Sequence, residues 1–311
     1  MKKLFLILCI LLLTTGCETA QKKEDEDPVY FLFATPLSTH TLWLQAKEGM
    51  EDACNELNIY CDWKGPTSID TNEMDHVVLA GVLQKCDGII TQGVIDPALI
   101  EKGAEVGIPF VLVDSGIADA SPLATITKDF TQQAELLLND IEKTLGEEEK
   151  LYIGIQVSQL SFDLAQEQIE AVKEVFKKHK GGFEITAISE SKSDKLHARE
   201  EWQKVLDRRM NVALNFAGEN AAGCVEAMQQ NGYQGTMLVY GVDDMEDTIQ
   251  LIKEGKIKGS VVTSFYNYGY EAVYLLYDAV VNHKTLEDPV IGAQLQLIDK
   301  AYLNTKQELK R

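Results

Sequence analysis

Residues 29–43 read VYFLFATPLSTHTLW, and this stretch decides how the rest of the chain is interpreted. Residues 29–33 are continuously apolar, which is typical of a central parallel strand covered on both sides. After Pro36 the apolar residues recur at the spacing of one helical face, at Trp43, Ala46, Met50, Ala53 and Leu57. The stretch therefore predicts a strand, a polar loop and a helix. Ligands bind at loops that follow parallel strands, so we expect residues 38–43 to form one wall of a site.

The same alternation of strands and helices continues along the chain. It predicts strand 59–63, a helix capped by Thr71 or Asn72 and ending near 85, strand 87–91, helix 97–106 and strand 109–114. A second series predicts helices 130–145, 162–178, 197–208, 221–231 and 245–254, and strands 151–156, 183–189, 212–216 and 236–240. This alternation is typical of doubly wound parallel sheets. The about 285 residues that follow the N-terminal segment are enough for two lobes of similar architecture.

The first residues are typical of an export signal. Two lysines precede an apolar run at 4–13, which is too short for a transmembrane helix and predicts a signal peptide over residues 1–16. The ending at Cys17 resembles a bacterial lipobox, in which the cysteine receives a diacylglycerol. An ordinary secretory signal cut nearby is the alternative. A lipidated Cys17 with a flexible tether over 17–27 predicts a lipid-anchored protein on the extracytoplasmic face of the cell membrane.

The charge and the cysteines restrict the function further. The formal net charge is −20 at pH 7, so the chain repels phosphate backbones and we expect no nucleic-acid partner. The cysteines at 54, 61, 86 and 224 match no zinc or redox spacing. Cys54 and Cys61 can form a disulfide in an exported protein, but we favour the interpretation that all four cysteines are buried thiols.

Several motifs, taken in order, resemble the type I periplasmic sugar-binding proteins, which include ribose-binding proteins. They are Trp43, the segment 63–70 (WKGPTSID), 86–90 (CDGII), 107–109 (GIP) with 113–115 (VDS), 240–243 (YGVD), 254–257 (EGKI) and Thr263. The resemblance covers residues 29–303 and is nearest to the branch that binds polyols, deoxysugars and autoinducer-2. It implies two Rossmann-like lobes joined by three crossovers, which close on a ligand like a hinge.

Carried onto this chain, the crossovers fall near residues 127–128, 263–265 and 294–297. The first lobe is then expected over residues 28–127 and 264–294, and the second over residues 128–263 and 295–311.

Sugar hydroxyls need carboxylates, amides and an aromatic ring. The resemblance places Trp43 over the sugar face, although core packing is the alternative for this residue. It places His40 as a polar contact, although an exposed loop histidine can also be idle. Asp114, at the end of a predicted strand, is the strongest candidate for accepting two hydroxyls, with a turn residue as the alternative.

The resemblance also assigns candidates around and opposite Asp114. Ser115 stands where ribose binders carry arginine, which speaks against ribose itself. Asp243 is the counterpart of Asp114 in the second lobe, although it could be a turn residue. The further candidates are Gln168 in place of an arginine, Asp163 as an acidic contact and Thr263 as a hinge contact.

We therefore predict a solute-binding protein that delivers a small sugar-like ligand to an ABC permease, acting as a monomer without a cofactor or metal. The alternative is a receptor, including a signalling-furanose sensor, that presents its closed form to a membrane histidine kinase. An enzyme is not expected, because the sequence has no nucleophile elbow, zinc-protease motif or phosphate loop.

Overall fold

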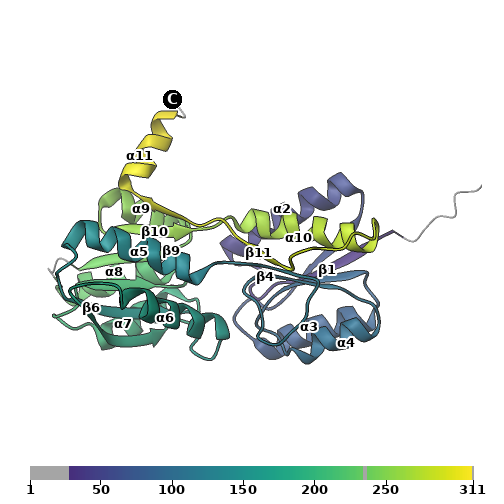
Figure 1. Cartoon of the computed structure of the whole chain (residues 1–311), viewed down its shortest axis with the longest axis horizontal. Coiled ribbons are helices and arrows are strands. Elements are labelled where there is room, and N and C mark those ends of the chain that lie inside the picture. Colours follow the sequence, from purple (N-terminus) through teal and green to yellow (C-terminus); the bar gives the residue numbers. More distant parts are fainter. Residues whose placement is uncertain (1–27, 234–236, 310–311) are drawn as a thin grey trace, which may run out of the picture.

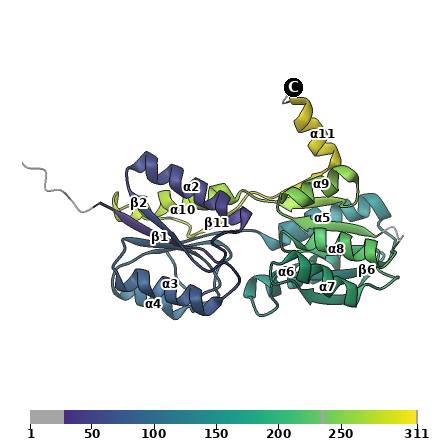
Figure 2. The same cartoon turned by 180° about the vertical axis from the view of Figure 1, so that it is seen from behind.

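A computed structural model describes residues 28–233 and 237–309 of the chain. The described residues form two lobes that lie side by side, with segments of the chain crossing between them (Figure 1). Helix α11 (Lys300–Leu309) projects from the second lobe, as the view from behind also shows (Figure 2). The predicted signal peptide, tether and lipidated Cys17 lie outside the described residues.

The first lobe is built on a parallel sheet with strand order β11-β5-β4-β3-β1-β2. Its strands are β1 (Tyr30–Ala34), β2 (Tyr60–Lys64), β3 (Gly88–Gln92), β4 (Phe110–Asp114), β5 (Ala124–Thr127) and β11 (Val290–Gly292). Helices α2 (Thr41–Leu57) and α10 (Phe265–Val280) cover one face, and α3 (Thr71–Leu83) and α4 (Ala98–Glu105) cover the other. The continuously apolar β1 is therefore central and covered on both sides, as predicted.

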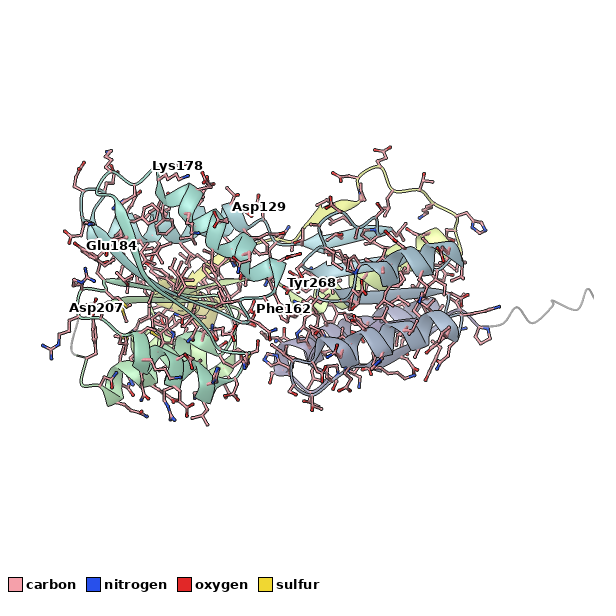
Figure 3. All side chains as sticks on the ribbon, turned by 90° about the horizontal axis from the view of Figure 1, so that it is seen from below. Asp129, Phe162, Lys178, Glu184, Asp207 and Tyr268 are labelled. Atoms are coloured by element: carbon pink, nitrogen blue, oxygen red, sulfur yellow. A yellow bond between two sulfur atoms is a disulfide. The ribbon has the colours of Figure 1, made fainter. Side chains whose placement is uncertain are left out.

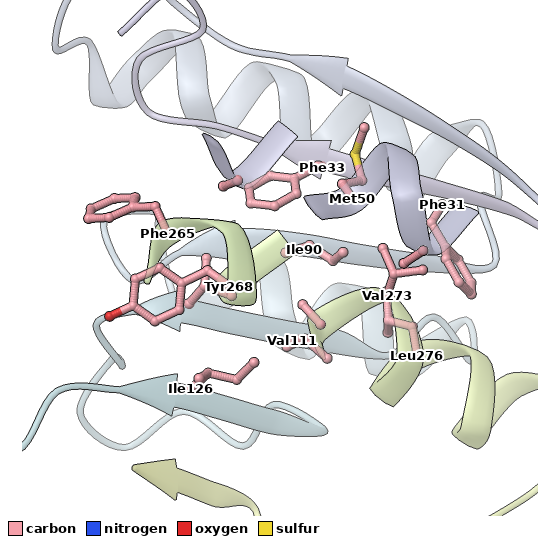
Figure 4. Close-up of a cluster of buried hydrophobic side chains, with 14 of the residues drawn as sticks. Phe31, Phe33, Met50, Ile90, Val111, Ile126, Phe265, Tyr268, Val273 and Leu276 are labelled. Atoms are coloured by element: carbon pink, nitrogen blue, oxygen red, sulfur yellow. The ribbon is translucent and has the colours of Figure 1, made fainter. Parts of the chain in front are cut away.

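Alternate residues of β1 supply the cores on the two faces of this sheet. Phe31 and Phe33 pack under α2 and α10, whereas Leu32 and Ala34 pack against α3 and α4. Figure 4 shows the first of these cores, where Phe31 and Phe33 lie near Met50 and the side chains of α10. Burial of large apolar side chains on both faces holds the sheet rigid and fixes where its carboxyl edge lies.

The second lobe repeats this plan with strand order β12-β10-β9-β8-β6-β7. Its strands are β6 (Leu151–Val157), β7 (Phe183–Glu190), β8 (Val212–Asn215), β9 (Leu238–Val242), β10 (Gly259–Val262) and β12 (Gln296–Asp299). Helices α5 (Phe130–Leu145) and α6 (Asp163–Phe176) cover one face, and α7 (Lys195–Val205), α8 (Asn220–Gln230) and α9 (Glu246–Glu254) cover the other. Strand β12 pairs antiparallel to β10, whereas β11 pairs parallel to β5.

The matching strand orders make positions in the two lobes equivalent. Strand β4 corresponds to β9, and β5 corresponds to β10. The residues that follow these strands therefore meet at the same edge of each sheet. This equivalence becomes important at the site, because Asp114 ends β4, Asp243 follows β9, and Lys128 and Thr263 follow β5 and β10.

Two predictions about local structure were wrong. Asp70, not Thr71 or Asn72, caps α3, because its carboxylate accepts the Glu73 backbone N–H at 3.0 Å. Cys54 and Cys61 form a disulfide between the end of α2 and β2, although buried thiols were favoured. Cys86 and Cys224 are buried free thiols. Within the described residues, no helix is both long enough and apolar enough to span a membrane.

Candidate functional site

A cleft lies between the carboxyl edges of the two sheets and takes its walls from both lobes. Its polar lining includes His40, Asp70, Gln92 and Asp114 from the first lobe, Lys128 from the crossover, and Ser158, Gln168, Ser193, Glu219 and Asp243 from the second lobe. Its apolar lining includes Leu37, Leu42, Trp43, Ile69, Met74, Val94, Phe162, Leu164, Phe216 and Phe265. Figure 3 shows Phe162 and Tyr268 at the junction of the lobes.

Two aspartates occupy equivalent strand ends on opposite sides of this cleft. Asp114 ends β4 with φ 69°, and Asp243 follows β9 with φ 64°. This left-handed backbone is uncommon for residues other than glycine, and aspartate tolerates it better than most. The two side chains are 6% and 7% exposed, so both carboxylates are largely shielded from water at the base of the cleft.

Lys128 lies between these carboxylates. Its ammonium contacts Asp114 Oδ1 at 2.7 Å and lies 3.9 Å from Asp243 Oδ1. The same ammonium sits 5.6 Å from the centre of the Phe265 ring. Burial opposes the charge on Lys128, but the adjacent Asp114 and Asp243 carboxylates raise its pKa above the ordinary value. Lys128 is therefore a permanent positive centre shared by the two lobes.

The two carboxylates are not equally well held. Gln92 Nε2 donates a hydrogen bond of 2.6 Å to Asp114 Oδ2, so Asp114 has a neutral donor as well as Lys128. Asp243 has the more distant Lys128, and burial raises its pKa to about 6 despite that charge. The charges of Asp114, Asp244 and Glu219 act in the same direction as burial. Asp243 is thus the carboxylate that gains most from an added hydrogen-bond donor.

A second contact joins the lobes through His40 and Glu219. His40 caps α2, and its Nδ1 accepts the Leu42 backbone N–H. This leaves Nε2 as the protonated nitrogen, which donates to Glu219 Oε1 from the second lobe. The two side chains are 16% and 12% exposed. The cap thus fixes the tautomer of the ring, and the tautomer directs its remaining N–H across the cleft.

Trp43 serves the cleft and the core together. It lines the cleft, yet it is only 5% exposed and packs edge-to-face on Phe265 at 5.3 Å and on Phe33 at 6.4 Å. These contacts hold the indole in place from the first-lobe core. An aromatic surface fixed in this way suits the less polar C–H face of a sugar.

The second lobe offers hydrogen-bond acceptors to the cleft. Gln168, on α6, is 3% exposed, and its Oε1 has no hydrogen-bond partner among the described residues. The same is true of Glu219 Oε2. A bound molecule that brings donors would satisfy these atoms, which are costly to bury alone. No group of three His, Cys, Asp or Glu side chains suited to a metal ion occurs in the part of the chain that the structure describes.

The structure brings five of the predicted residues to the cleft, namely His40, Trp43, Asp114, Gln168 and Asp243. It does not bring the other three there. Ser115 is buried beside Asp114 but does not line the cleft, and Asp163 is exposed at the start of α6. Thr263 lines a groove behind the crossovers instead.

Several polar residues of the cleft were not chosen as candidates from the sequence, among them Gln92, Glu219 and Lys128. Gln92 ends β3, so the rule that strand ends carry the site would have found it. Glu219 follows β8 by a few residues and is accessible to the same rule. Lys128 directly follows β5, but that strand was not predicted, and a lone lysine is ordinarily a solvated side chain.

Comparison with known proteins gives one family match. A sequence model of the periplasmic binding protein domain matches residues 31–284. No curated protein matches the chain by sequence.

Several solved structures share the fold. A glucose-galactose binding protein, GanP from Geobacillus stearothermophilus, has TM-score 0.82 at 21% identity, over 89% of this chain and 99% of its own. An ABC transporter solute-binding protein from Agrobacterium vitis, solved with D-fucose, has TM-score 0.81 at 18% identity, over 89% and 98%. The XylFII–LytSN complex contains a chain with TM-score 0.79 at 23% identity, over 88% and 98%.

Proposed function

Because this chain belongs to the periplasmic binding protein domain family, we propose that it is an extracytoplasmic solute-binding protein for a small sugar-like ligand. The observation that carries this proposal is the convergence of Asp114 and Asp243, from opposite lobes, on one ammonium at the base of the cleft. A ligand that contacts both lobes at once stabilises the closed arrangement, which is how hinge closure reports binding. We infer a binding role and not an enzymatic one.

The cleft lining favours an uncharged, hydroxyl-rich ligand. Asp114, Asp243, Gln168 and Glu219 present acceptor oxygens, and hydroxyls donate to such atoms. Carboxylate or phosphate groups on a ligand would meet three buried or half-buried carboxylates and only one buried ammonium. Acidic sugars and sugar phosphates are therefore poor candidates.

A thermal-shift screen tests the binding role, because a ligand that binds only the folded state raises its apparent stability. We would use the detergent-solubilised full chain with D-glucose, D-galactose, D-xylose, L-arabinose, D-fucose, D-tagatose and sorbitol. A shift that is lost in Asp114→Gly and Asp243→Gly, which keep the left-handed backbone, but kept in Asp207→Gly, would support the cleft. Asp207 lies at the far end of the second lobe and is a matched acidic control (Figure 3). No shift, or a shift that survives both cleft variants, would refute the proposed site.

We propose delivery to an ABC permease, with closure about crossovers near residues 127–128, 263–265 and 294–297. The alternative is sensing, which is favoured by the fold shared with a chain of the XylFII–LytSN complex. Deleting the protein would abolish uptake of the bound sugar in the first case. In the second case uptake would continue, and only the transcriptional response to the sugar would be lost.

We also propose that a lipid on Cys17 anchors the protein to the membrane. The short apolar run at residues 4–13 and the acidic segment that follows Cys17 support this proposal. Cells fed labelled palmitate should label the wild-type protein and not Cys17→Ser. Equal labelling of the two would refute the anchor.

A further inference from the structure

Lys128 occupies a position that belongs to neither lobe alone. It follows β5, the last strand of the first lobe before the chain crosses over, and precedes α5 of the second lobe. Its ammonium meets one carboxylate from each lobe, at 2.7 Å from Asp114 and 3.9 Å from Asp243. The lysine side chain is 7% exposed, so water does not screen these contacts strongly.

The backbone around Lys128 is fixed on both sides. Thr127 pairs with Asp114 in the sheet, and its carbonyl accepts the Ala293 N–H at 2.8 Å from the third crossover. On the other side Asp129 caps α5 through the Gln132 N–H at 3.0 Å. Figure 3 places Asp129 at the junction of the lobes. The ammonium is therefore aimed from the crossover itself, and its position does not depend on the loops of the cleft.

The equivalent position in the second lobe carries no charge. Strand β10 corresponds to β5, so Thr263 is the counterpart of Lys128, and the phenylalanines at 130 and 265 begin the helices that follow. Two acidic positions thus share one basic residue. Without Lys128, two buried carboxylates would face each other with no positive charge between them. Their repulsion would disfavour both the charged form of the carboxylates and the approach of the two lobes.

We propose that Lys128 is a positioning residue of the cleft, which holds the carboxylates of Asp114 and Asp243 together between the lobes, so that a ligand meets two acceptors at one point. The inference rests on the proposed function, because it takes these carboxylates as ligand contacts. Lys128 acts through the two aspartates. The groups that face Asp243 are Lys128, Asp114, Asp244, Glu219 and Tyr268.

The first test needs no ligand. In Lys128→Met, carboxyl-carbon NMR should show the Asp243 titration midpoint moving up from about 6 by about 1–3 pH units, since an opposite charge at this distance is removed. Lys128→Arg should restore most of the wild-type midpoint. Lys195→Met is the matched control, because Lys195 also bridges two carboxylates, Glu226 and Asp247, but within one lobe.

The second test measures the distance between the two lobes. Spin labels at Asn72→Cys on α3 and Glu200→Cys on α7, both exposed, report the distance between the lobes. We expect Lys128→Met to lengthen it and Lys128→Met with Asp243→Asn to restore it, because the double variant no longer buries two unneutralised carboxylates. The double variant also separates this effect from a failure to fold.

An unchanged Asp243 midpoint and unchanged lobe distance in Lys128→Met would overturn the inference. That result would leave the proposed function intact, because sugar binding is tested separately by the screen. Conversely, a screen without hits would refute the proposed function even if Lys128 behaves as expected.

Discussion

The contact between His40 and Glu219 makes a quantitative prediction about closure. The bond joins loops of opposite lobes and its partners are mostly buried, so it forms only when the lobes are close. A hydrogen bond to a charged group contributes about 1.5–3 kcal/mol. Taking the lower end, its removal should lower the ratio of closed to open molecules by about tenfold, because 1.4 kcal/mol corresponds to a factor of ten.

His40 also caps α2, so the variant must separate the two roles. His40→Asn keeps a good cap, but its side chain is too short to reach Glu219. It should lower the ratio of closed to open molecules with little loss of folding stability. His40→Ala should shift the lobes equally and lose about 1 kcal/mol of folding stability as well, since alanine cannot cap. Glu219→Gln keeps a neutral acceptor and should have a smaller effect than Glu219→Ala.

Distances between spin labels at Asn72→Cys and Glu200→Cys measure the separation of the two lobes. Urea unfolding followed by circular dichroism measures folding stability. An unchanged distance distribution in His40→Asn would refute the reasoning about closure. Equal losses of stability in His40→Asn and His40→Ala would refute the assignment of the cap.

Three further predictions concern stability. The folded state raises the pKa of Asp243, so the protonated carboxyl stabilises the fold; this contribution is fully present below about pH 3.8 and is lost as the pH rises through about 6. Asp243→Asn should therefore raise the melting temperature above pH 6. A higher melting temperature at pH 4 alone would contradict this prediction. Replacing Cys54 and Cys61 together by alanine should lower the free energy of unfolding by about 2.5 kcal/mol, from the short loop that the disulfide closes, and dithiothreitol should reproduce the loss in the wild type only. Gly49→Ala places a methyl group 2.0 Å from the Tyr266 carbonyl oxygen, where α2 packs on α10. It should lower the free energy of unfolding in urea by about 1–3 kcal/mol. Glu48→Ala, on the exposed side of the same helix, should leave this free energy unchanged.

Hydrophobic patterning was sufficient to predict four strands of each sheet, but not β5, β10, β11 and β12, which are short and lie at one edge of the two sheets. The run at 29–33 and the spacing of Trp43, Ala46 and Met50 are set by which faces are buried, and the structure confirms both. Helix α10 was not predicted, although it buries one face against α2. The disulfide depends on how closely the end of α2 approaches β2, which patterning does not contain.

The site divides in the same way. Asp114 was found because it ends a predicted strand, and a strand end in a parallel sheet has a known location, whereas Asp243 was found through the family resemblance as its counterpart in the second lobe. Lys128 was missed because its role depends on the distance between two lobes, which no local pattern encodes. Thr263 was chosen for the hinge, yet the charged hinge residue is its counterpart after β5.

The left-handed backbone at Asp114 and Asp243 limits how this cleft can be redesigned. Asparagine and glycine can adopt the same φ without much strain, whereas valine, isoleucine and threonine cannot. A mutant library that samples all residues at these two positions would therefore contain mostly destabilised members. Changes of ligand preference are better sought on neighbouring positions with ordinary backbone angles, such as Gln168 and Glu219, with the two aspartates varied only to asparagine or glycine.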